Sequence, residues 1–306
     1  MNKVLNNYNL GEVKQIKKVD SGIMNETYIV ETSDDKFILQ EIKDKRITRD
    51  HQTLESIWNS DIQIPKQIKS NSGKLFHKQN GKTYRVITYI DNEDLETLTS
   101  DLCFKLGKTL AEFHIQTSEF NDELEYSIPY FHNTRKIMND LLSIRLSNVS
   151  SEKWSGVSEY YDTIISDIEN LYLPHLPARL IHGDPKWQNF LYKNNKVTGI
   201  VDFETLMYAN ELIDIGDALR SWSKDEEYNF DKKRFDASIQ GYLSRNSTVE
   251  ESLIPRAAGL ITLELSARFL IDYFNQEEFK LTESELMNKL QNQMKFYQDM
   301  KEQLKL

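Results

Sequence analysis

Cysteine is almost absent from this chain, because Cys103 is the only one among 306 residues. A single thiol cannot form an intramolecular disulfide, and a structural zinc site built on cysteines needs several of them. Cys103 lies between Leu102 and Phe104 in an apolar stretch, so we expect a buried, unreactive thiol. The low cysteine content favours the reducing environment of the cytoplasm.

The chain also lacks long hydrophobic runs and an excess of basic residues. No apolar run approaches the ~18 residues of a membrane span, and the first residues lack the apolar core of a signal peptide. The formal net charge is −10 and the lysines are scattered, which argues against nucleic-acid binding. We therefore expect a folded cytoplasmic protein, a monomer or homodimer, whose partner is a small molecule rather than a membrane or a nucleic acid.

The two parts of the chain differ in their hydrophobic pattern. β-Branched and aromatic runs predict strands at 16–19, 27–32, 36–42, 74–77 and 82–90, with one helix at 46–59. Helical periodicity follows at 98–114, 135–146, 157–171, 213–222, 235–243, 254–274 and 283–304. We expect an α+β fold with a small antiparallel β-rich N-terminal lobe (1–90) and a large, mainly helical C-terminal lobe (91–306). A strand-rich island at 179–203 interrupts the helices.

The island carries acidic and amide side chains at a spacing that suits phosphoryl transfer. Asp184 follows an apolar strand in a tight His-Gly-Asp-Pro loop, and Asn189 comes five positions later. A polar turn at 193–196 predicts a hairpin that brings Asp202 back beside Asn189. Phosphoryl transfer to a hydroxyl needs a carboxylate that accepts the proton and oxygen ligands for Mg²⁺. Asp184 is thus the candidate base, and Asn189 and Asp202 are the candidate metal ligands.

Each of these residues also has a structural interpretation. Asp184 precedes a proline, and Asp-Pro is a common turn opener. Asn189 could belong to a turn, and Asp202 could cap a helix. The complete combination is much harder to explain by structure alone, so it favours the catalytic interpretation.

The motif at 182–184 with Asn189, followed by Val-Asp-Phe-Glu at 201–204, resembles the aminoglycoside phosphotransferase and choline kinase family. The resemblance implies a protein-kinase-like fold, because the pattern parallels the H-R-D-x-x-x-x-N and D-F-G motifs of protein kinases. It implies a phosphotransferase that uses ATP and Mg²⁺ to phosphorylate an alcohol group of a small molecule. It also implies a catalytic role for Lys186, two positions after Asp184.

Five further segments resemble the sugar 1-kinases of the N-acetylhexosamine 1-kinase type: 22–28, 37–40, 128–132, 214–220 and 268–273. This resemblance implies an N-acetylhexosamine or a related hexose as acceptor, phosphorylated at the anomeric hydroxyl. It makes His132, Arg268 and Glu204 the candidate substrate contacts. An aminoglycoside or choline-type acceptor is the alternative, and a catalytically inactive ligand-binding homologue is a third interpretation.

The candidate substrate and bracing residues keep structural alternatives. His132 could be a structural histidine, and Arg268 could form an ion-paired stripe with Glu264 and Asp272, which lie at helical spacing. Four more residues are candidates for bracing the catalytic loop or lining a sugar-binding face: Asp217, Arg220, Trp187 and Tyr208.

The resemblance places nucleotide contacts in one turn and one strand end of the N-terminal lobe: Ser21, Gly22, Thr88, Tyr89 and Ile90. Most of the wider family has Lys or Arg on the third strand to bind the phosphates, whereas this chain has Gln40 at that position, which we also count among the nucleotide contacts. Lys43 or Lys36 could supply the missing cation, with Glu55 on the next helix as its partner.

Overall fold

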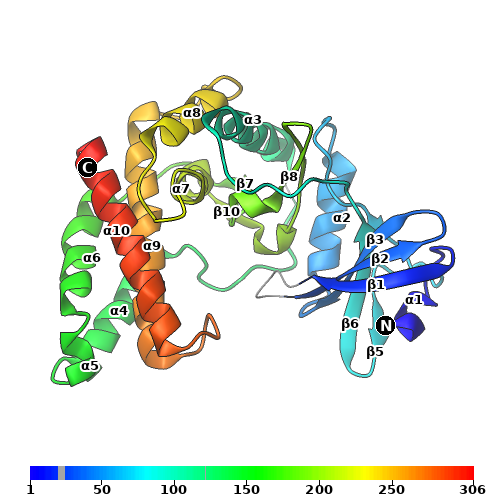
Figure 1. Ribbon diagram of the computed structural model, residues 1–306, viewed down its shortest axis with the longest axis horizontal. Helices are drawn as coiled ribbons and strands as arrows, with labels where there is room; N and C mark the ends of the chain where they lie inside the picture. Colours follow the sequence, from blue (N-terminus) through cyan, green and yellow to red (C-terminus); the bar gives the residue numbers. More distant parts are fainter. Residues whose placement is uncertain (20–24, 121) are drawn as a thin grey trace. The chain divides into compact units, whose positions relative to one another are not determined.

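A computed structural model describes residues 1–19, 25–120 and 122–306 of the chain (Figure 1). The chain divides into two compact units. The N-terminal unit contains 1–94, 116–127 and 189–206, and the C-terminal unit contains 95–115, 128–188 and 207–306. The expected lobe boundary near residue 90 thus separates the first segment, but two later segments also join the N-terminal unit.

An antiparallel sheet forms the frame of the N-terminal unit. Its strands are β1 (Val13–Val19), β2 (Glu26–Thr32), β3 (Lys36–Ile42), β4 (Gln67–Ile68), β5 (His77–Gln79) and β6 (Lys82–Thr88). The order is β1-β2-β3-β6-β4, with β5 also paired to β6. The strand expected at 74–77 begins only at His77, because a turn closed by the Ser70 N–H and the Lys74 carbonyl (2.8 Å) precedes it.

The sheet encloses a core built from its inward-facing side chains. Val30, Leu39 and Val86 are completely buried on β2, β3 and β6, and Val4 and Leu5 of the short helix α1 (Asn2–Leu5) pack with them. Alternation along each strand sends these side chains to one face. The core therefore fixes the register in which β3 and β6 face each other.

Helix α2 (Ile47–Ile57) ties the segment 116–127 to this unit. Asp50 of α2 accepts the backbone N–H groups of Glu125 and Tyr126 at 2.8 and 2.9 Å. A short 3₁₀ turn at Thr117–Glu119 also contacts α2. The helix that was expected at 46–59 is therefore confirmed, and it also anchors a distant segment.

The hairpin expected around 193–196 is formed by β8 (Phe190–Lys193) and β9 (Lys196–Ile200). Gln63 joins it to the N-terminal unit, since its N–H donates to the Thr198 carbonyl (2.8 Å) and its carbonyl accepts the Ile200 N–H (2.9 Å). The two candidate metal ligands, at the ends of this hairpin, therefore belong to the N-terminal unit.

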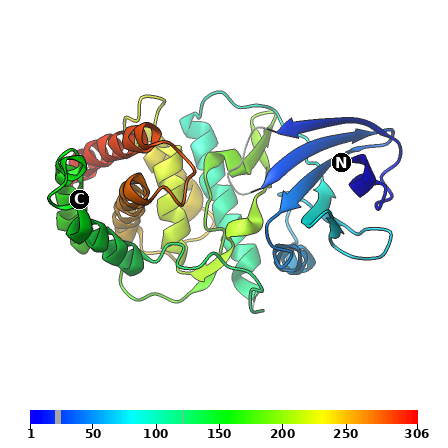
Figure 2. The ribbon, with the colours of Figure 1, turned by 90° about the horizontal axis from the view of Figure 1, so that it is seen from below.

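The C-terminal unit is mainly helical (Figure 2). Its helices are α3 (Ser100–Gln116), α4 (Thr134–Asn148), α5 (Glu152–Ser155), α6 (Ser158–Leu171), α7 (Glu211–Trp222), α8 (Lys232–Leu243), α9 (Ile254–Asn275) and α10 (Glu283–Leu304). Helix α9 is apolar on most of its surface, because α4, α6, α7 and α10 all pack against it. Strands β7 (Arg179–Ile181) and β10 (Met207–Ala209) form a small antiparallel ribbon, of which β10 was not expected.

Helix α3 crosses α8 at a very short distance. A methyl group added at Gly107 of α3 would overlap the Ser238 carbonyl, and one added at Gly241 of α8 would overlap the Phe104 carbonyl. Cys103, next to this crossing, is completely buried, and burial raises the pKa of its thiol to about 11. The expected buried, unreactive thiol is thus confirmed.

None of the helices in the described part of the chain combines the length and the hydropathy of a membrane span.

Candidate active site

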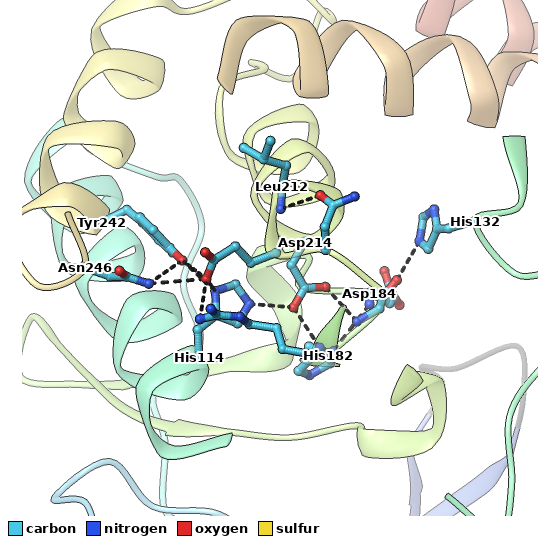
Figure 3. Close-up of polar contacts among 12 residues, drawn as sticks. His114, His132, His182, Asp184, Leu212, Asp214, Tyr242 and Asn246 are labelled. Carbon is cyan, nitrogen blue, oxygen red and sulfur yellow. Dashed lines mark hydrogen bonds and ion pairs between the residues drawn. The ribbon is translucent and has the colours of Figure 1, made fainter. Parts of the chain in front are cut away.

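The loop that carries the candidate base is held by a buried carboxylate. Strand β7 leads directly into the loop 182–184, where Gly183 adopts a left-handed φ of 84° that suits glycine. Asp214 of α7 accepts the backbone N–H groups of His182 and Gly183, each at 2.7 Å (Figure 3). It also contacts His114 Nε2 of α3 at 3.0 Å. Burial favours the neutral carboxyl, but these hydrogen bonds and the nearby imidazoles hold the pKa of Asp214 below its usual range.

A second layer of polar groups supports His114 (Figure 3). His114 Nδ1 lies 2.7 Å from the Tyr242 hydroxyl, which donates to Glu211 Oε2 at 3.1 Å. Asn246 donates to the same hydroxyl at 3.1 Å. Asp214 was noted from the sequence only as part of the segment 214–220 that resembles the sugar 1-kinases, and His114 was not expected in the site. A possible signal was the presence of ionisable residues on the buried faces of two otherwise apolar helices.

His132 braces the same loop from its other side. Its Nδ1 lies 2.8 Å from Glu264 Oε1 of α9, and its Nε2 lies 2.8 Å from the Gly183 carbonyl. Both partners are acceptors, so both ring nitrogens donate and the ring is an imidazolium. Burial lowers the pKa of His132, but the charge of Glu264 outweighs burial and the net shift is upward. The structure therefore gives both nitrogens of this candidate substrate contact other partners, as the structural alternative predicted.

The candidate base itself is more accessible than its supports. The Asp184 carboxylate is 25% exposed and accepts from Lys186 Nζ at 2.6 Å. Trp222 Nε1 donates to the Pro185 carbonyl at 2.9 Å, which fixes the chain between the two residues to α7. The expected proximity of Lys186 to Asp184 is thus present, and the catalytic role of the pair stays a prediction.

Asn189 and Asp202 lie at facing ends of the β8–β9 hairpin. The Val201 N–H donates to the Asn189 carbonyl at 2.9 Å, directly beyond the paired residues Phe190 and Ile200. Asp202 has a left-handed φ of 72° and precedes a short 3₁₀ turn, but its carboxylate makes no capping hydrogen bond to the described residues. An amide oxygen and a carboxylate suit Mg²⁺, which keeps several waters and binds phosphates. Among the described residues, no group of three or more His, Cys, Asp and Glu forms a ready metal cluster.

Glu204 is almost completely buried and has partners within the N-terminal unit. Its Oε1 accepts from Arg85 Nη2 at 3.1 Å and from the Asn25 side-chain amide. Burial raises the pKa of the Glu204 carboxyl, and the positive charge of Arg85 acts against that rise. This carboxylate is therefore engaged by an internal cation, and its expected contact with the substrate stays a prediction.

Arg268 also has internal partners. Its Nε donates to Glu278 Oε1 at 2.9 Å, and its guanidinium lies 5.1 Å from the Phe131 ring. The expected stripe with Glu264 and Asp272 does not form, because Glu264 pairs with His132 and Asp272 accepts the backbone N–H groups of 277–279. A substrate contact by Arg268 stays a prediction.

The proposed nucleotide contacts are only partly within the described residues. Ser21 and Gly22 lie outside them. Thr88 ends β6, where its N–H donates to the Lys66 carbonyl at 2.9 Å, and Tyr89 and Ile90 follow it. Their contacts with adenine stay predictions.

Lys36, one of the two cations expected beside Gln40, pairs with another carboxylate than the expected Glu55. Glu55 accepts the Gln67 N–H at 2.8 Å, whereas Lys36 forms an exposed pair with Glu31 at 2.8 Å. Gln40 Oε1 instead accepts from Arg85 Nε at 2.8 Å.

Several known kinases are similar to this chain. A curated homoserine kinase of Xanthobacter autotrophicus is 23% identical over 283 residues, which cover 90% of this chain and 85% of that protein. Among solved structures, a microcompartment-associated aminopropanol kinase has a TM-score of 0.69 at 16% identity, covering 99% of this chain and 96% of the other. An aminoglycoside phosphotransferase from Alicyclobacillus acidocaldarius has a TM-score of 0.70 at 13% identity, covering 100% and 96%. These likenesses confirm the protein-kinase-like fold.

The sequence model of the phosphotransferase enzyme family matches residues 15–246, which include the catalytic loop, the hairpin and helix α7. This match confirms the family expected from the motif at 182–184 and the segment 201–204. The chain therefore belongs to the phosphotransferase enzyme family and is a kinase that acts on hydroxyl groups.

Proposed function

We propose that this protein transfers the γ-phosphoryl group of ATP to a hydroxyl of a small polar molecule, with Asp184 as base. The observation that carries this proposal is the way the loop 182–184 is held. Asp214 fixes two of its N–H groups and His132 fixes its Gly183 carbonyl, while the Asp184 carboxylate remains partly exposed. A rigid backbone with an accessible carboxylate is what general-base catalysis requires.

The residues have separate tasks in this proposal. Asp184 orients the acceptor hydroxyl and accepts its proton, and the Lys186 ammonium pairs with its carboxylate at 2.6 Å. Asn189 and Asp202 would hold Mg²⁺, which neutralises charge on the phosphates when it is bound. The backbone around Tyr89 would bind adenine.

For the acceptor, we propose a sugar, an N-acetylhexosamine or related hexose phosphorylated at the anomeric hydroxyl. Two exposed aromatic rings support this choice: Tyr130 is 65% exposed and lies two positions before His132, and Tyr208 is 41% exposed and pairs with Leu180 of β7. Tyr208 therefore flanks the strand that leads into the catalytic loop, and Tyr130 lies close in sequence to His132, which contacts that loop. Exposed aromatic faces are suited to pack against the apolar face of a sugar ring.

A homoserine-like acceptor is the second candidate, because the curated relative named above is a homoserine kinase. One feature of this chain supports it. Burial and the neighbouring Arg220 lower the pKa of Lys224 to about 7, and Arg220 pairs with Asp217 at 2.7 Å. A carboxylate-bearing acceptor would favour the charged form of Lys224 and pair with it. Lys224→Met should then raise KM for homoserine and leave KM for a neutral sugar unchanged.

An acceptor panel tests the proposal. ADP formation is measured with N-acetylhexosamines, hexoses, homoserine, aminopropanol and aminoglycosides, with Asp184→Asn as the matched inactive control. We expect ADP that depends on one acceptor class, and phosphorus NMR of the product then identifies the esterified hydroxyl. Turnover with homoserine alone would reject the sugar assignment. Mg-ATP binding without turnover on any hydroxyl compound would reject the catalytic proposal.

A further inference from the structure

The third strand of this protein lacks the cation that binds phosphates in most of its family, but the neighbouring strand supplies one. Gln40 of β3 stands directly opposite Arg85 of β6 in the antiparallel register. Side chains directly opposite each other lie on one face, with Cβ atoms ~5 Å apart. A positive charge on the side chain at position 40 or at position 85 therefore lies at nearly the same place in the fold.

The Arg85 guanidinium is 2% exposed and connects three elements. Its Nε donates to Gln40 Oε1 at 2.8 Å, and its Nη2 donates to Glu204 Oε1 at 3.1 Å. Its Nη1 lies 3.4 Å from His51 Nδ1 of α2. One buried cation thus joins β3, α2 and the metal-binding loop.

The tautomer of His51 shows that the third contact is favourable. His51 Nε2 lies 2.7 Å from the Pro65 carbonyl, which can only accept, so Nε2 carries the proton. Nδ1 is then an acceptor for Arg85. Burial, with the charge of Arg85, lowers the pKa of His51 to about 3, which agrees with a neutral ring.

This arrangement is not readily explained by stability. A buried ion pair loses hydration on both partners, and well-packed apolar side chains are often at least as stable. The Glu55 carboxylate of α2 instead accepts the Gln67 N–H at 2.8 Å. The cation is instead directed at Glu204, two positions after the metal ligand Asp202. That placement indicates a role at the metal-binding loop.

We propose that Arg85 supplies from β6 the positive charge that β3 lacks. It acts as a positioning residue: through Glu204 it fixes the loop that carries Asp202, so that this carboxylate is preorganised for the Mg²⁺-nucleotide complex. The ion pair between Arg85 and Glu204 thereby replaces the strand lysine–helix glutamate pair used by protein kinases. This inference rests on the proposed kinase function.

The first experiment measures nucleotide binding without turnover. Calorimetry with Mg²⁺ and a non-hydrolysable ATP analogue compares the wild type, Arg85→Gln, and the exposed-lysine control Lys36→Gln. We expect Arg85→Gln to weaken binding about tenfold or more, the effect of one lost charged hydrogen bond, and Lys36→Gln to bind like the wild type. A further variant, Lys43→Gln, tests the rival cation, whose charge also acts on Glu204. If Lys43→Gln weakens binding and Arg85→Gln does not, the inference is wrong.

The second experiment moves the positive charge from β6 to the facing position on β3. The exchange variant Gln40→Lys/Arg85→Gln should recover most of the affinity that Arg85→Gln loses, because the two positions face each other. No recovery in a folded exchange variant overturns the inference. If Arg85→Gln does not fold, Arg85→Lys keeps the charge but loses the planar fork and should bind with intermediate affinity; wild-type affinity would contradict the proposal.

The two experiments separate this inference from the proposed function. A wild type that fails to bind the Mg²⁺-nucleotide complex rejects the kinase proposal. A wild type that binds normally, with an Arg85→Gln variant that binds equally well, rejects only the role of Arg85. The KM of the acceptor provides a further check, since a positioning residue of the metal loop should leave it unchanged.

Discussion

The contact between His132 and Glu264 predicts a measurable coupling within the catalytic loop. His132→Asn is the suitable perturbation, because His132 has a left-handed φ of 53°, which asparagine tolerates. The variant loses the 2.8 Å contact with the Gly183 carbonyl, and Glu264 loses its charged partner but keeps the Thr134 hydroxyl, which donates to it at 2.8 Å. Removing one partner of a buried ion pair costs ~3–5 kcal/mol of unfolding free energy.

A double-mutant cycle separates the pair from its surroundings. Urea unfolding is measured for the wild type, His132→Asn, Glu264→Gln and the double variant. Since hydrogen bonds to charged groups contribute ~1.5–3 kcal/mol, the double variant should lose less stability than the sum of the single losses by about that amount. A coupling energy within ~0.3 kcal/mol of zero would refute the assigned ion pair.

The pH dependence of the unfolding free energy tests the same ion pair independently. The pKa of His132 is raised in the folded protein by Glu264, against the effect of burial. Its stabilising contribution is therefore complete below the unfolded value of ~6.5 and is lost as pH rises through the folded pKa. The stability difference between the wild type and His132→Asn should shrink at alkaline pH. A difference that grows with pH would show that the imidazole is neutral in the fold.

The same His132→Asn variant should also affect catalysis. Because the Gly183 carbonyl precedes the base, kcat should fall while KM for ATP changes little.

Three more outcomes are expected. Asp184→Ala should lower kcat ~10²-fold or more while the protein still binds ATP, as measured by steady-state kinetics and calorimetry. Asp202→Asn should weaken Mg²⁺-nucleotide binding more than Asn189→Ala does, because hard cations favour charged oxygens; equal, undiminished affinities would remove both residues from the metal site. Gly107→Ala should lower the unfolding free energy by ~1–3 kcal/mol in urea titration, because its methyl group would overlap the Ser238 carbonyl; unchanged stability would mean that the helices separate at little cost.

The elements with strong local signals could be predicted from the sequence. The predicted helix at 283–304 coincides with α10, because Thr282 and Glu285 form a capping box at its start and the apolar spacing continues to its end. Asn80-Gly81 closes its hairpin with two left-handed residues, as such pairs do. Strands β4 and β10 were missed, because pairing with distant strands stabilises them and their own sequences carry little signal.

The proximity of Asn189 to Asp202 could also be predicted, because it is encoded at short range. Asp184 and Asn189 belong to one loop, and a hairpin of about ten residues brings Asp202 to Asn189. The supports of that loop could not be predicted in the same way. Asp214 of α7 reaches it directly, whereas Glu264 of α9 acts on it through His132, and only the packing of those helices decides which polar side chains lie there.

Arg85 shows most clearly why the sequence cannot be interpreted one position at a time. At Gln40 the sequence differs from its family, and this difference is the feature that favoured an inactive homologue. Gln40 and Arg85 are 45 positions apart, and a register shift of one residue would place their side chains on opposite faces. The register is fixed by the core residues Val30, Leu39 and Val86, none of which contacts a phosphate in the proposed mechanism. The loss of a charge on β3 therefore does not imply the loss of that charge from the site. An inactive homologue would need no buried cation beside the loop that carries Asp202, so the presence of Arg85 at this place favours an active kinase.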